Sequence, residues 1–405
     1  MPDLIYPSDA YKDITQHEIK AMKAEYNLAD AHTRQSQSPT QREIVERLPE
    51  LWYESEKTNQ HEMEERFIHA FFHSQRQTTA LTTPTMLVYA SSIAMVMIAN
   101  FLALKKMSVS LLEPCFDNIY DILHNMDISI DKPLNEEWLH DPDAIYQNLT
   151  ENVNADAVFI VEPNNPTGFT LEGTTQTVNE RKNSYLELIR YAKDHSKLLI
   201  FDFCFSSFLL EDAESASFDV YKELDQSGVS YIIVEDTGKT WPLQDTKVAM
   251  LKSSKDLHSY LHNIHTSYLL NVSPFILNLV TQYVEDSEKD NFASVFELLK
   301  QNRDTAKIAL DGSLLELQDS MANVSVAWLK MKSQLLKASD LQILIQQQGV
   351  YILPGTNFFW SDHAKGEGFM RIALARDTSM FNEAIGKLRT ILDEIESNLI
   401  EAARE

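Results

Sequence analysis

Short apolar segments alternate with helical patterns between about residues 85 and 250. Nearly continuous apolar runs are typical of strands covered on both faces, and their alternation with helices favours a mainly parallel sheet. One run is weaker than the others, because Ser108 and Ser110 interrupt it. The predicted strands are Met86–Tyr89, Met107–Leu112, Ala157–Val161, Leu198–Phe203, Tyr231–Glu235 and Val248–Leu251.

The C-terminal part of the chain has a different pattern, which is mostly helical from roughly residue 280 onward. Only a few strand-like pieces interrupt it, so we expect a smaller α+β domain there. We therefore predict an α/β protein with a large, mainly parallel sheet domain over 51–285 and a small domain over 286–405. The late elements are the strands Ser325–Met331, Val350–Leu353 and Phe369–Ala375 and a closing helix over Asn382–Arg404.

Residues 1–50 are expected to form an N-terminal arm or lid and part of the small domain. Apolar side chains recur at helical spacing within residues 12–35, and a Ser-Pro-Thr turn at 38–40 begins a second helical pattern. The apolar positions are Ile19, Met22 and Tyr26 in the first pattern and Ile44, Val45, Leu48, Leu51 and Trp52 in the second.

The longest apolar stretch, Ile93–Leu104, contains only one polar residue, Asn100. It is too short to span a membrane and indicates a buried helix, so we expect no membrane partner. Residues 1–11 lack a basic segment followed by an apolar run, which argues against a signal peptide. A cytoplasmic protein is the resulting expectation.

Composition narrows the function further. The formal net charge of -25 disfavours a nucleic-acid partner, because binding to phosphates needs a basic patch. Cys115 and Cys204 are the only cysteines, so neither a disulfide framework nor a Cys/His zinc spacing is present, and we expect no metal. With 10 glycines and no Gly-x-Gly-x-x-Gly motif, a dinucleotide site is also disfavoured.

Three polar motifs follow predicted strands of the large domain. Asn164-Asn165-Pro166-Thr167-Gly168 comes just after Ala157–Val161, Asp202 lies near the end of the predicted strand Leu198–Phe203, and Lys239 lies in a turn after Tyr231–Glu235. The carboxyl ends of parallel strands are where α/β sheets bind ligands. Each motif alone also fits a plain turn, a strand-end carboxylate or an exposed lysine; their ordered combination, followed by Arg371, is specific.

This ordered set resembles fold-type I enzymes that depend on pyridoxal 5'-phosphate (PLP), of the aspartate aminotransferase type, over most of the chain. By that resemblance, Lys239 would bind PLP as a Schiff base, and Asp202 would keep the ring nitrogen protonated. Arg371 would clamp the substrate carboxylate. The other implied cofactor contacts are Asn165 at the phenolic oxygen, Phe116 stacked on the ring, and Ser91 and Ser92 at the phosphate, where a helix begins.

The chain departs from the ordinary aminotransferase pattern at three positions. Phe205 stands where a tyrosine usually donates to the cofactor oxygen, and Asp236 stands where a serine usually binds phosphate. Lys247 replaces the phosphate-binding arginine. A carboxylate would repel phosphate, so we expect Asp236 to face a cation instead. These departures argue against plain transamination.

The N-terminal arm sharpens the resemblance. Thr15-Gln16-His17-Glu18, the segment 27–35 and Glu235-Asp236-Thr237-Gly238-Lys239-Thr240-Trp241-Pro242 resemble the O2-dependent L-arginine oxidases and hydroxylases of natural-product pathways, of the indolmycin and enduracididine type. That resemblance implies that Glu18 and Asp236, assisted by Thr15, bind the guanidinium, whose planar charged fork suits two carboxylates. It places His32 over the reacting carbons with Asp30 beside it. From the residues alone, Thr15 and Glu18 also match a capping box.

The expected activity is PLP- and O2-dependent oxidation of L-arginine to an unsaturated 2-oxo or imino acid, with release of ammonia and peroxide. Hydroxylation to 4-hydroxy-2-ketoarginine is the close alternative, and a class I/II aminotransferase is a further one. A PLP-fold protein that only binds ligands is disfavoured, because Lys239, Asp202 and Arg371 occur together. We also expect a homodimer or a dimer of dimers, since this fold places its active site at a subunit interface.

Overall fold

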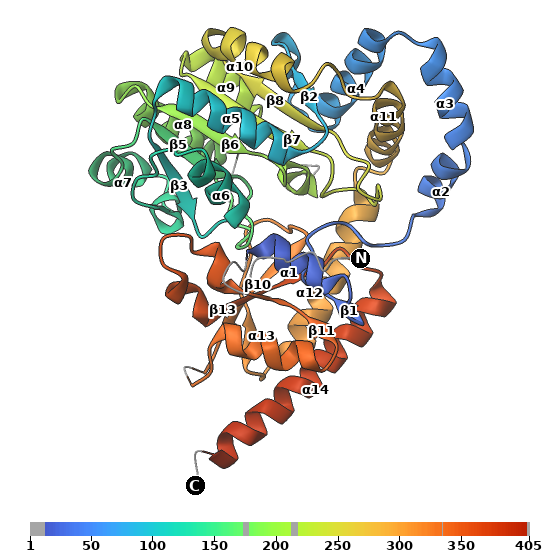
Figure 1. The fold of residues 1–405 in the computed structure, drawn as a ribbon, viewed down its shortest axis with the longest axis vertical. Coiled ribbons are helices and arrows are strands. Elements are labelled where there is room, and N and C mark those ends of the chain that lie inside the picture. The colour runs from blue at the N-terminus through green and yellow to red at the C-terminus, as the bar shows by residue number, and fades with distance from the viewer. Residues whose placement is uncertain (1–12, 173–177, 212–217, 334, 403–405) are drawn as a thin grey trace, which may run out of the picture.

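The computed structural model describes residues 13–172, 178–211, 218–333 and 335–402 (Figure 1). Its centre is a seven-stranded sheet in the order β2-β8-β7-β6-β5-β3-β4. All neighbouring strands from β7 to β4 run parallel, whereas β8 is antiparallel to both β7 and β2. The strands are β2 (Met86–Val88), β3 (Val109–Glu113), β4 (Leu134–Asn135), β5 (Ala157–Val161), β6 (Leu198–Asp202), β7 (Tyr231–Asp236) and β8 (Ala249–Ser253).

Every residue of β3, β5, β6, β7 and β8 is buried, as the continuous apolar runs predict. The interrupted run differs from its predicted bounds of Met107–Leu112, because β3 begins at Val109 and continues to Glu113. Ser110 does not break this strand: it is buried, and its hydroxyl donates to the carbonyl of Lys132. The predicted α/β architecture, with a large and mainly parallel sheet, is confirmed.

Helices cover the large sheet on both sides (Figure 1). The apolar stretch Ile93–Leu104 forms most of a buried helix, α5, which packs against β7, β8 and α10. The helices of this part are α2 (Pro39–Glu46), α3 (Leu48–Lys57), α4 (Gln60–Ser74), α5 (Ser91–Lys105), α6 (Asp117–Asn125), α7 (Ile145–Asn152), α8 (Val178–Asp194), α9 (Val220–Ser227), α10 (Lys255–Tyr268) and α11 (Pro274–Lys289). Short 3-10 helices lie at Thr78–Thr82, Glu136–Leu139 and Ser206–Glu211.

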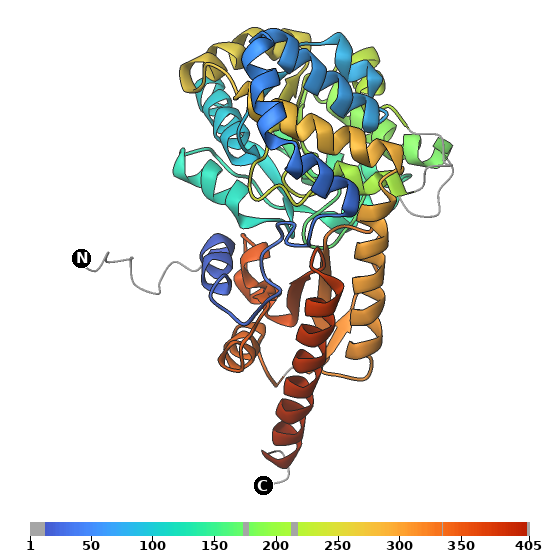
Figure 2. The same cartoon turned by 90° about the vertical axis from the view of Figure 1, so that its right-hand side faces the viewer.

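A second, smaller sheet lies below the large one, with strand order β12-β13-β10-β9 and antiparallel pairing throughout (Figure 2). Helices α12, α13 and α14 surround it, and α14 extends away from the body of the molecule. The elements are α12 (Ala293–Leu310), β9 (Leu315–Leu317), β10 (Val326–Met331), α13 (Ala338–Gln347), β11 (Val350–Tyr351), β12 (Leu353–Pro354), β13 (Phe369–Ala373), α14 (Thr378–Ala402) and 3-10 helices at Gly355–Phe358 and His363–Gly368.

The N-terminal arm differs from its prediction. Only Ile14–Ala21 is helical (α1), and Tyr26–Asn27 pairs as β1 with β11 in parallel. Ile19 and Met22 are exposed, while Ile14, His17 and Ala21 face the interior, so the predicted apolar face was wrong. Tertiary packing decides this helix: its buried side carries a polar histidine, which hydrogen-bonds the hydroxyl of Tyr351 at 2.8 Å.

The second arm pattern forms two helices, α2 and α3. A capping box on Ser38 and Gln41 begins α2, as the Ser-Pro-Thr turn predicts. Ile44 and Leu51 are buried, whereas Trp52 on the same predicted face is half exposed. The domain boundaries near residues 50 and 285 stay predictions. Residues 1–11, which are interpreted as lacking a signal peptide, lie outside the described ranges, and so does Arg404 at the end of the predicted last helix. Within the described ranges, no helix is both long and apolar enough to cross a bilayer.

Candidate active site

Three parallel strands bring the predicted residues to one edge of the large sheet. Val161 at the end of β5 pairs with Asp202 at the end of β6, and Asp202 pairs with Val234 near the end of β7. Because the strands run parallel, the segments that leave them meet at their carboxyl ends. Asn165 and Lys239 lie in the turns that follow β5 and β7.

Lys239 and two carboxylates form one end of this site. Burial raises the pKa of Asp202, the charge of Asp236 adds to that shift, and the Lys239 ammonium opposes it. Asp202 accepts from the backbone N–H of Cys204 at 3.0 Å, and Asp236 accepts from that of Gly238 at 2.9 Å. Within the described part of the chain, the Lys239 amine has neither a hydrogen bond nor an ion pair. It is therefore a free, half-buried amine beside an acidic pair.

Helix α5 begins next to this site at Ser91. Its N-cap residue, Ala90, provides no side-chain cap, so the first backbone N–H groups of a 15-residue helix are open to a ligand. Ser91 also hydrogen-bonds the thiol of Cys204, whose pKa is raised first by burial and then by Asp202 and Asp236. Cys204 thus borders the site, which its apolar sequence neighbours did not indicate. Ser92 is exposed at the same helix start.

Arg371, on β13 of the small sheet, reaches the same place from below. Its side chain is fully buried; Nη1 donates to Asn165 Oδ1 at 3.1 Å, and Nη2 donates to the Glu18 carboxylate at 3.2 Å and to the carbonyl of Ala29. Burial lowers the pKa of this guanidinium, and Glu18 opposes the shift. Its Nε–H has no partner within the described residues, and such a buried donor is costly to leave unpaired.

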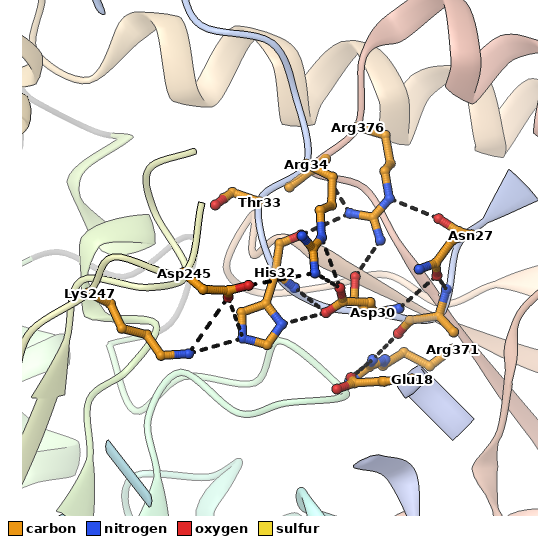
Figure 3. A network of polar contacts seen from close by, with 12 residues as sticks. Glu18, Asn27, Asp30, His32, Thr33, Arg34, Asp245, Lys247, Arg371 and Arg376 are labelled. Atoms are coloured by element: carbon orange, nitrogen blue, oxygen red, sulfur yellow. Dashed lines mark hydrogen bonds and ion pairs between the residues drawn. The ribbon is translucent and has the colours of Figure 1, made fainter. Parts of the chain in front are cut away.

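The arm residues form a second polar network beside Arg371 (Figure 3). Asp30 accepts from His32 Nδ1 at 2.5 Å and from two nitrogens of Arg34 at 2.8 and 3.0 Å. Burial tends to raise the pKa of Asp30, but the hydrogen bonds and charges of His32 and Arg34 hold it well below its usual range. Asp30 is therefore ionised, so it accepts from the Nδ1–H of His32.

Lys247 lies against His32 in this structure. Its Nζ is 3.3 Å from His32 Nε2 and 3.9 Å from Asp245 Oδ1 (Figure 3). The preceding residues Gln244 and Asp245 both have positive φ, at 52° and 62°. Such a strained pair is uncommon for residues other than glycine and is often found at functional sites. The predicted phosphate role of Lys247 stays a prediction.

The remaining predicted residues lie nearby with varied surroundings. Phe116 is the N-cap of α6 and packs against a small buried cluster that includes Ile14 and Phe358. Thr15 is exposed on α1. The capping-box alternative for Thr15 and Glu18 is wrong, because Asp13 is the N-cap and its carboxylate accepts from Gln16.

Ligand atoms of Glu18, Asp30 and His32 all lie within 4.8 Å of one another, a spacing that could hold a cation. Both carboxylates are already paired with guanidinium groups, on Arg371 and Arg34. A metal ion would have to compete with those arginines. The expectation that the site uses no metal stays a prediction.

The sequence agrees with this geometry. Residues 26–388 match the family described as aminotransferase class I and II. The chain belongs to this family. Its curated relatives include an aspartate aminotransferase of Pyrococcus horikoshii, 22% identical over 64% of this chain and 63% of the relative. An LL-diaminopimelate aminotransferase of Maridesulfovibrio salexigens is 25% identical over 57% of this chain and 55% of the relative. The matched part thus spans somewhat under two thirds of these relatives.

Solved structures of the aminotransferase fold are similar over nearly the whole chain. A structure of MppP soaked with the product 2-ketoarginine has a TM-score of 0.79 and 29% identity, over 90% of this chain and 99% of that one. An aspartate aminotransferase from Thermus thermophilus with maleate has a TM-score of 0.72 and 14% identity, over 94% and 97% of the two chains. The likeness to the Thermus thermophilus enzyme shows the fold alone, whereas the likeness to MppP extends to the sequence.

The residues present fit PLP, the cofactor of this family. Three groups at the site lack a partner within the described ranges: the Lys239 amine, the Asn165 amide nitrogen and Arg371 Nε. They match a covalent anchor, a donor to a phenolic oxygen and a donor to a substrate carboxylate. The open start of α5 suits the phosphate, and Asp202 suits the ring nitrogen.

Proposed function

We propose that this aminotransferase-family chain oxidises L-arginine with PLP and O2. The observation that carries the proposal is the likeness to MppP, whose product is 2-ketoarginine. The carboxylates Glu18 and Asp236, near Arg371 and Lys239, support it. 2-Ketoarginine is arginine with its α-amine replaced by an oxo group. A natural-product pathway is the proposed setting, after the resemblance in the arm.

Arg371 would bind the α-carboxylate of arginine through its unpaired Nε and one Nη. Glu18 now occupies Nη2 of that guanidinium, as a substrate carboxylate would. The substrate carboxylate would release Glu18, which could then meet the substrate guanidinium together with Asp236. No buried charge would be left unpaired by this exchange, which is the condition for it to be inexpensive.

The cofactor, when bound, supplies an electron sink for the bond broken at Cα. Lys239, freed as an amine, would take the Cα proton. His32 would move a proton at Nε2, provided that Lys247 turns from this nitrogen to the phosphate. In the overall reaction O2 takes two electrons and two protons to give peroxide, while water replaces the nitrogen and releases ammonia. A second O2 would take two more electrons and two more protons from the side chain, which would give an unsaturated product and a second peroxide.

Water exclusion would decide between oxidase and hydroxylase outcomes. A role of the arm in this exclusion is supported by one contact: Thr33 Oγ1 donates to the carbonyl of Trp241 at 2.5 Å, in the loop after Lys239. If water reached the unsaturated intermediate, 4-hydroxy-2-ketoarginine would form. Plain transamination is the further alternative, favoured by the curated relatives.

An oxygen electrode with L-arginine, followed by mass spectrometry of the product, tests the proposal. We expect O2 uptake together with ammonia, peroxide and a 2-oxo acid. A hydroxylated product that carries 18O from labelled water would identify the hydroxylase. Amino transfer from arginine to an added 2-oxo acid, without O2 uptake, would overturn the proposal in favour of an aminotransferase.

A further inference from the structure

Arg376 is a fully buried arginine whose hydrogen bonds are all to backbone carbonyls. It lies between β13 and α14, and its Nε donates to the carbonyl of Asn27 at 2.8 Å. Nη1 donates to His32 and Ala375 at 2.9 Å each, and Nη2 donates to Asp30 at 2.5 Å. Figure 3 shows the guanidinium beside the arm segment that carries Asp30 and His32.

The arm segment over 27–32 has little structure of its own to hold it. After β1 the segment is irregular; the Leu28 carbonyl accepts from the backbone N–H of Ala373 at 2.7 Å and the Ala29 carbonyl accepts from Arg371, and the other carbonyls need further donors. Three of them are paired by Arg376, while the side chain of Asn27 accepts from the N–H groups of Ala29 and Asp30 at 3.0 and 3.2 Å. The guanidinium and the loop therefore satisfy each other.

The position of Arg376 is itself fixed from the small domain. Asn302, fully buried on α12, donates to the carbonyls of Leu374 and Arg376 at 2.7 and 2.8 Å. Burying a guanidinium is expensive unless its donors are paired. A side chain held this firmly transmits the position of the small sheet to the arm.

We propose that Arg376 is a positioning residue that orients the Asp30–His32 pair toward the edge of the large sheet where Lys239 lies. This inference rests on the proposed function for the role of His32, and on the structure alone for the geometry. Arg376 holds the carbonyls of both paired residues, so its fork fixes how far apart they stand. Lysine also has three donors, but all of them lie on one nitrogen, so lysine cannot reproduce the spacing that the planar guanidinium fork imposes on the three arm carbonyls.

A purely structural role is the competing explanation, and the chain contains a matched control. Arg303 on α12 also uses its guanidinium on backbone carbonyls, those of Val324 and Val326, at 3.0 Å each. Burial lowers the pKa of both Arg303 and Arg376 to about 10, although Arg303 is partly exposed and Arg376 is fully buried. Among the described residues, Arg303 donates to Asn323, Val324 and Val326, none of which belongs to the arm.

The experiment compares Arg376→Lys with Arg303→Lys in the cofactor-loaded enzyme. The first readout is the downfield proton NMR resonance of the His32 Nδ1–H that donates to Asp30, assigned by its absence in His32→Ala. We expect the resonance to be lost or shifted in Arg376→Lys and retained in Arg303→Lys. Asn27→Ala, which loosens the same loop without touching a buried charge, should act like Arg376→Lys and serves if the latter does not fold.

The second readout is the product ratio from L-arginine. Arg376→Lys should change it by the same factor as His32→Ala, whereas Arg303→Lys should keep the wild-type ratio. An unchanged resonance in Arg376→Lys or Asn27→Ala, or the same loss in Arg303→Lys, would overturn the positioning role. If the wild type takes up no O2 with arginine, the proposed function fails, while the resonance still decides the role of Arg376.

Discussion

Three lysines near the large sheet have different surroundings, and the differences single out one of them. Lys252 is fully buried and donates to the carbonyls of Ala80 and Thr83 and to the hydroxyl of Thr85, so it is held by its hydrogen bonds. Lys247 faces His32. Lys239 alone of the three has an unengaged amine beside a buried carboxylate. An amine must be free to form a Schiff base.

We therefore predict that Lys239→Ala removes the visible absorbance of the lysine–cofactor link and all turnover with arginine. Lys255→Ala, on the exposed start of α10, should keep both. Absorbance spectra of the two purified variants, with and without added PLP, check this. A Schiff-base band that survives in Lys239→Ala would show that another lysine carries the cofactor.

The guanidinium specificity is a second prediction for single residues. Glu18→Ala or Asp236→Ala should cost roughly 2–5 kcal/mol of selectivity for arginine, as expected when one partner of a buried charge pair is removed. Values of kcat/KM for L-arginine and for uncharged L-citrulline measure the change. Glu25→Ala, which breaks an exposed arm ion pair with Lys387, is the control and should leave selectivity unchanged. Equal losses for both substrates would mean that Glu18 and Asp236 are structural.

At the scale of elements, a buried carboxyl joins α1 to α6. Asp117, in the first turn of α6, accepts from the backbone N–H of Ile14 at 2.8 Å, where α1 begins. Burial raises the pKa of Asp117 to about 8, the Ile14 N–H opposes the shift, and nearby Asp121, Asp13 and Glu18 add to it. The folded protein therefore holds a proton that the unfolded chain releases near its ordinary pKa of 3.8.

This protonation predicts the pH dependence of arm docking. A raised folded pKa contributes stability that is fully present below about pH 4 and is lost as the pH rises through about 8. Asp117→Asn keeps an acceptor for the N–H of Ile14 but cannot ionise. The variant should therefore avoid roughly 1–3 kcal/mol of the unfolding free energy that the wild type loses as the pH rises, a magnitude typical of an uncompensated buried polar group. Thermal melts and limited proteolysis of the 22–37 segment, from pH 5 to 9, measure it.

Asp127→Asn is the matched control, because it removes the same charge from an exposed position just after α6. It should leave the pH profile as in the wild type. If Asp117→Asn and the wild type lose stability in parallel with rising pH, Asp117 is ionised in the folded protein and the docking explanation is wrong.

At the scale of the whole molecule, the site lies where the two sheets meet. The large sheet contributes Lys239 and Asp202, the small sheet contributes Arg371, and the arm crosses between them with Asp30 and His32 (Figure 1). A substrate held by Arg371 and joined to the cofactor on Lys239 would tie these parts together. Relative movement of the two parts would then open and close the site.

The expected assembly is a homodimer or a dimer of dimers. Trp52 and Tyr53 on α3 are more than half exposed, at 53% and 59%, and Leu270 is 92% exposed. We expect a partner subunit to cover these side chains. Light scattering of the loaded enzyme should give a mass of two or four chains. A fully active monomer would contradict this prediction.

The sequence alone determined the large sheet and the identity of its edge residues. Apolar runs as short as five or six residues favour strands buried on both faces, whereas the longer run Ile93–Leu104 favours a helix. The strands β5, β6 and β7 follow from this local pattern, and their parallel pairing brings the residues after them together. The arm could not be derived in this way. Its buried face carries His17, and its exposed face carries Ile19, because the surface that covers it comes from distant residues such as Asp117, 103 positions from Ile14, and Tyr351, 334 positions from His17.

Tertiary structure also decided which polar groups act on one another. No local spacing indicates that Arg371 contacts both Glu18 and Asn165, or that Lys247 faces His32. Arg376 looks like an ordinary charged residue before a helix, yet it is buried against the arm. Periodicity reports which side of an element is apolar, whereas the pairing of buried charges depends on where distant segments are brought together, and only the folded chain specifies that.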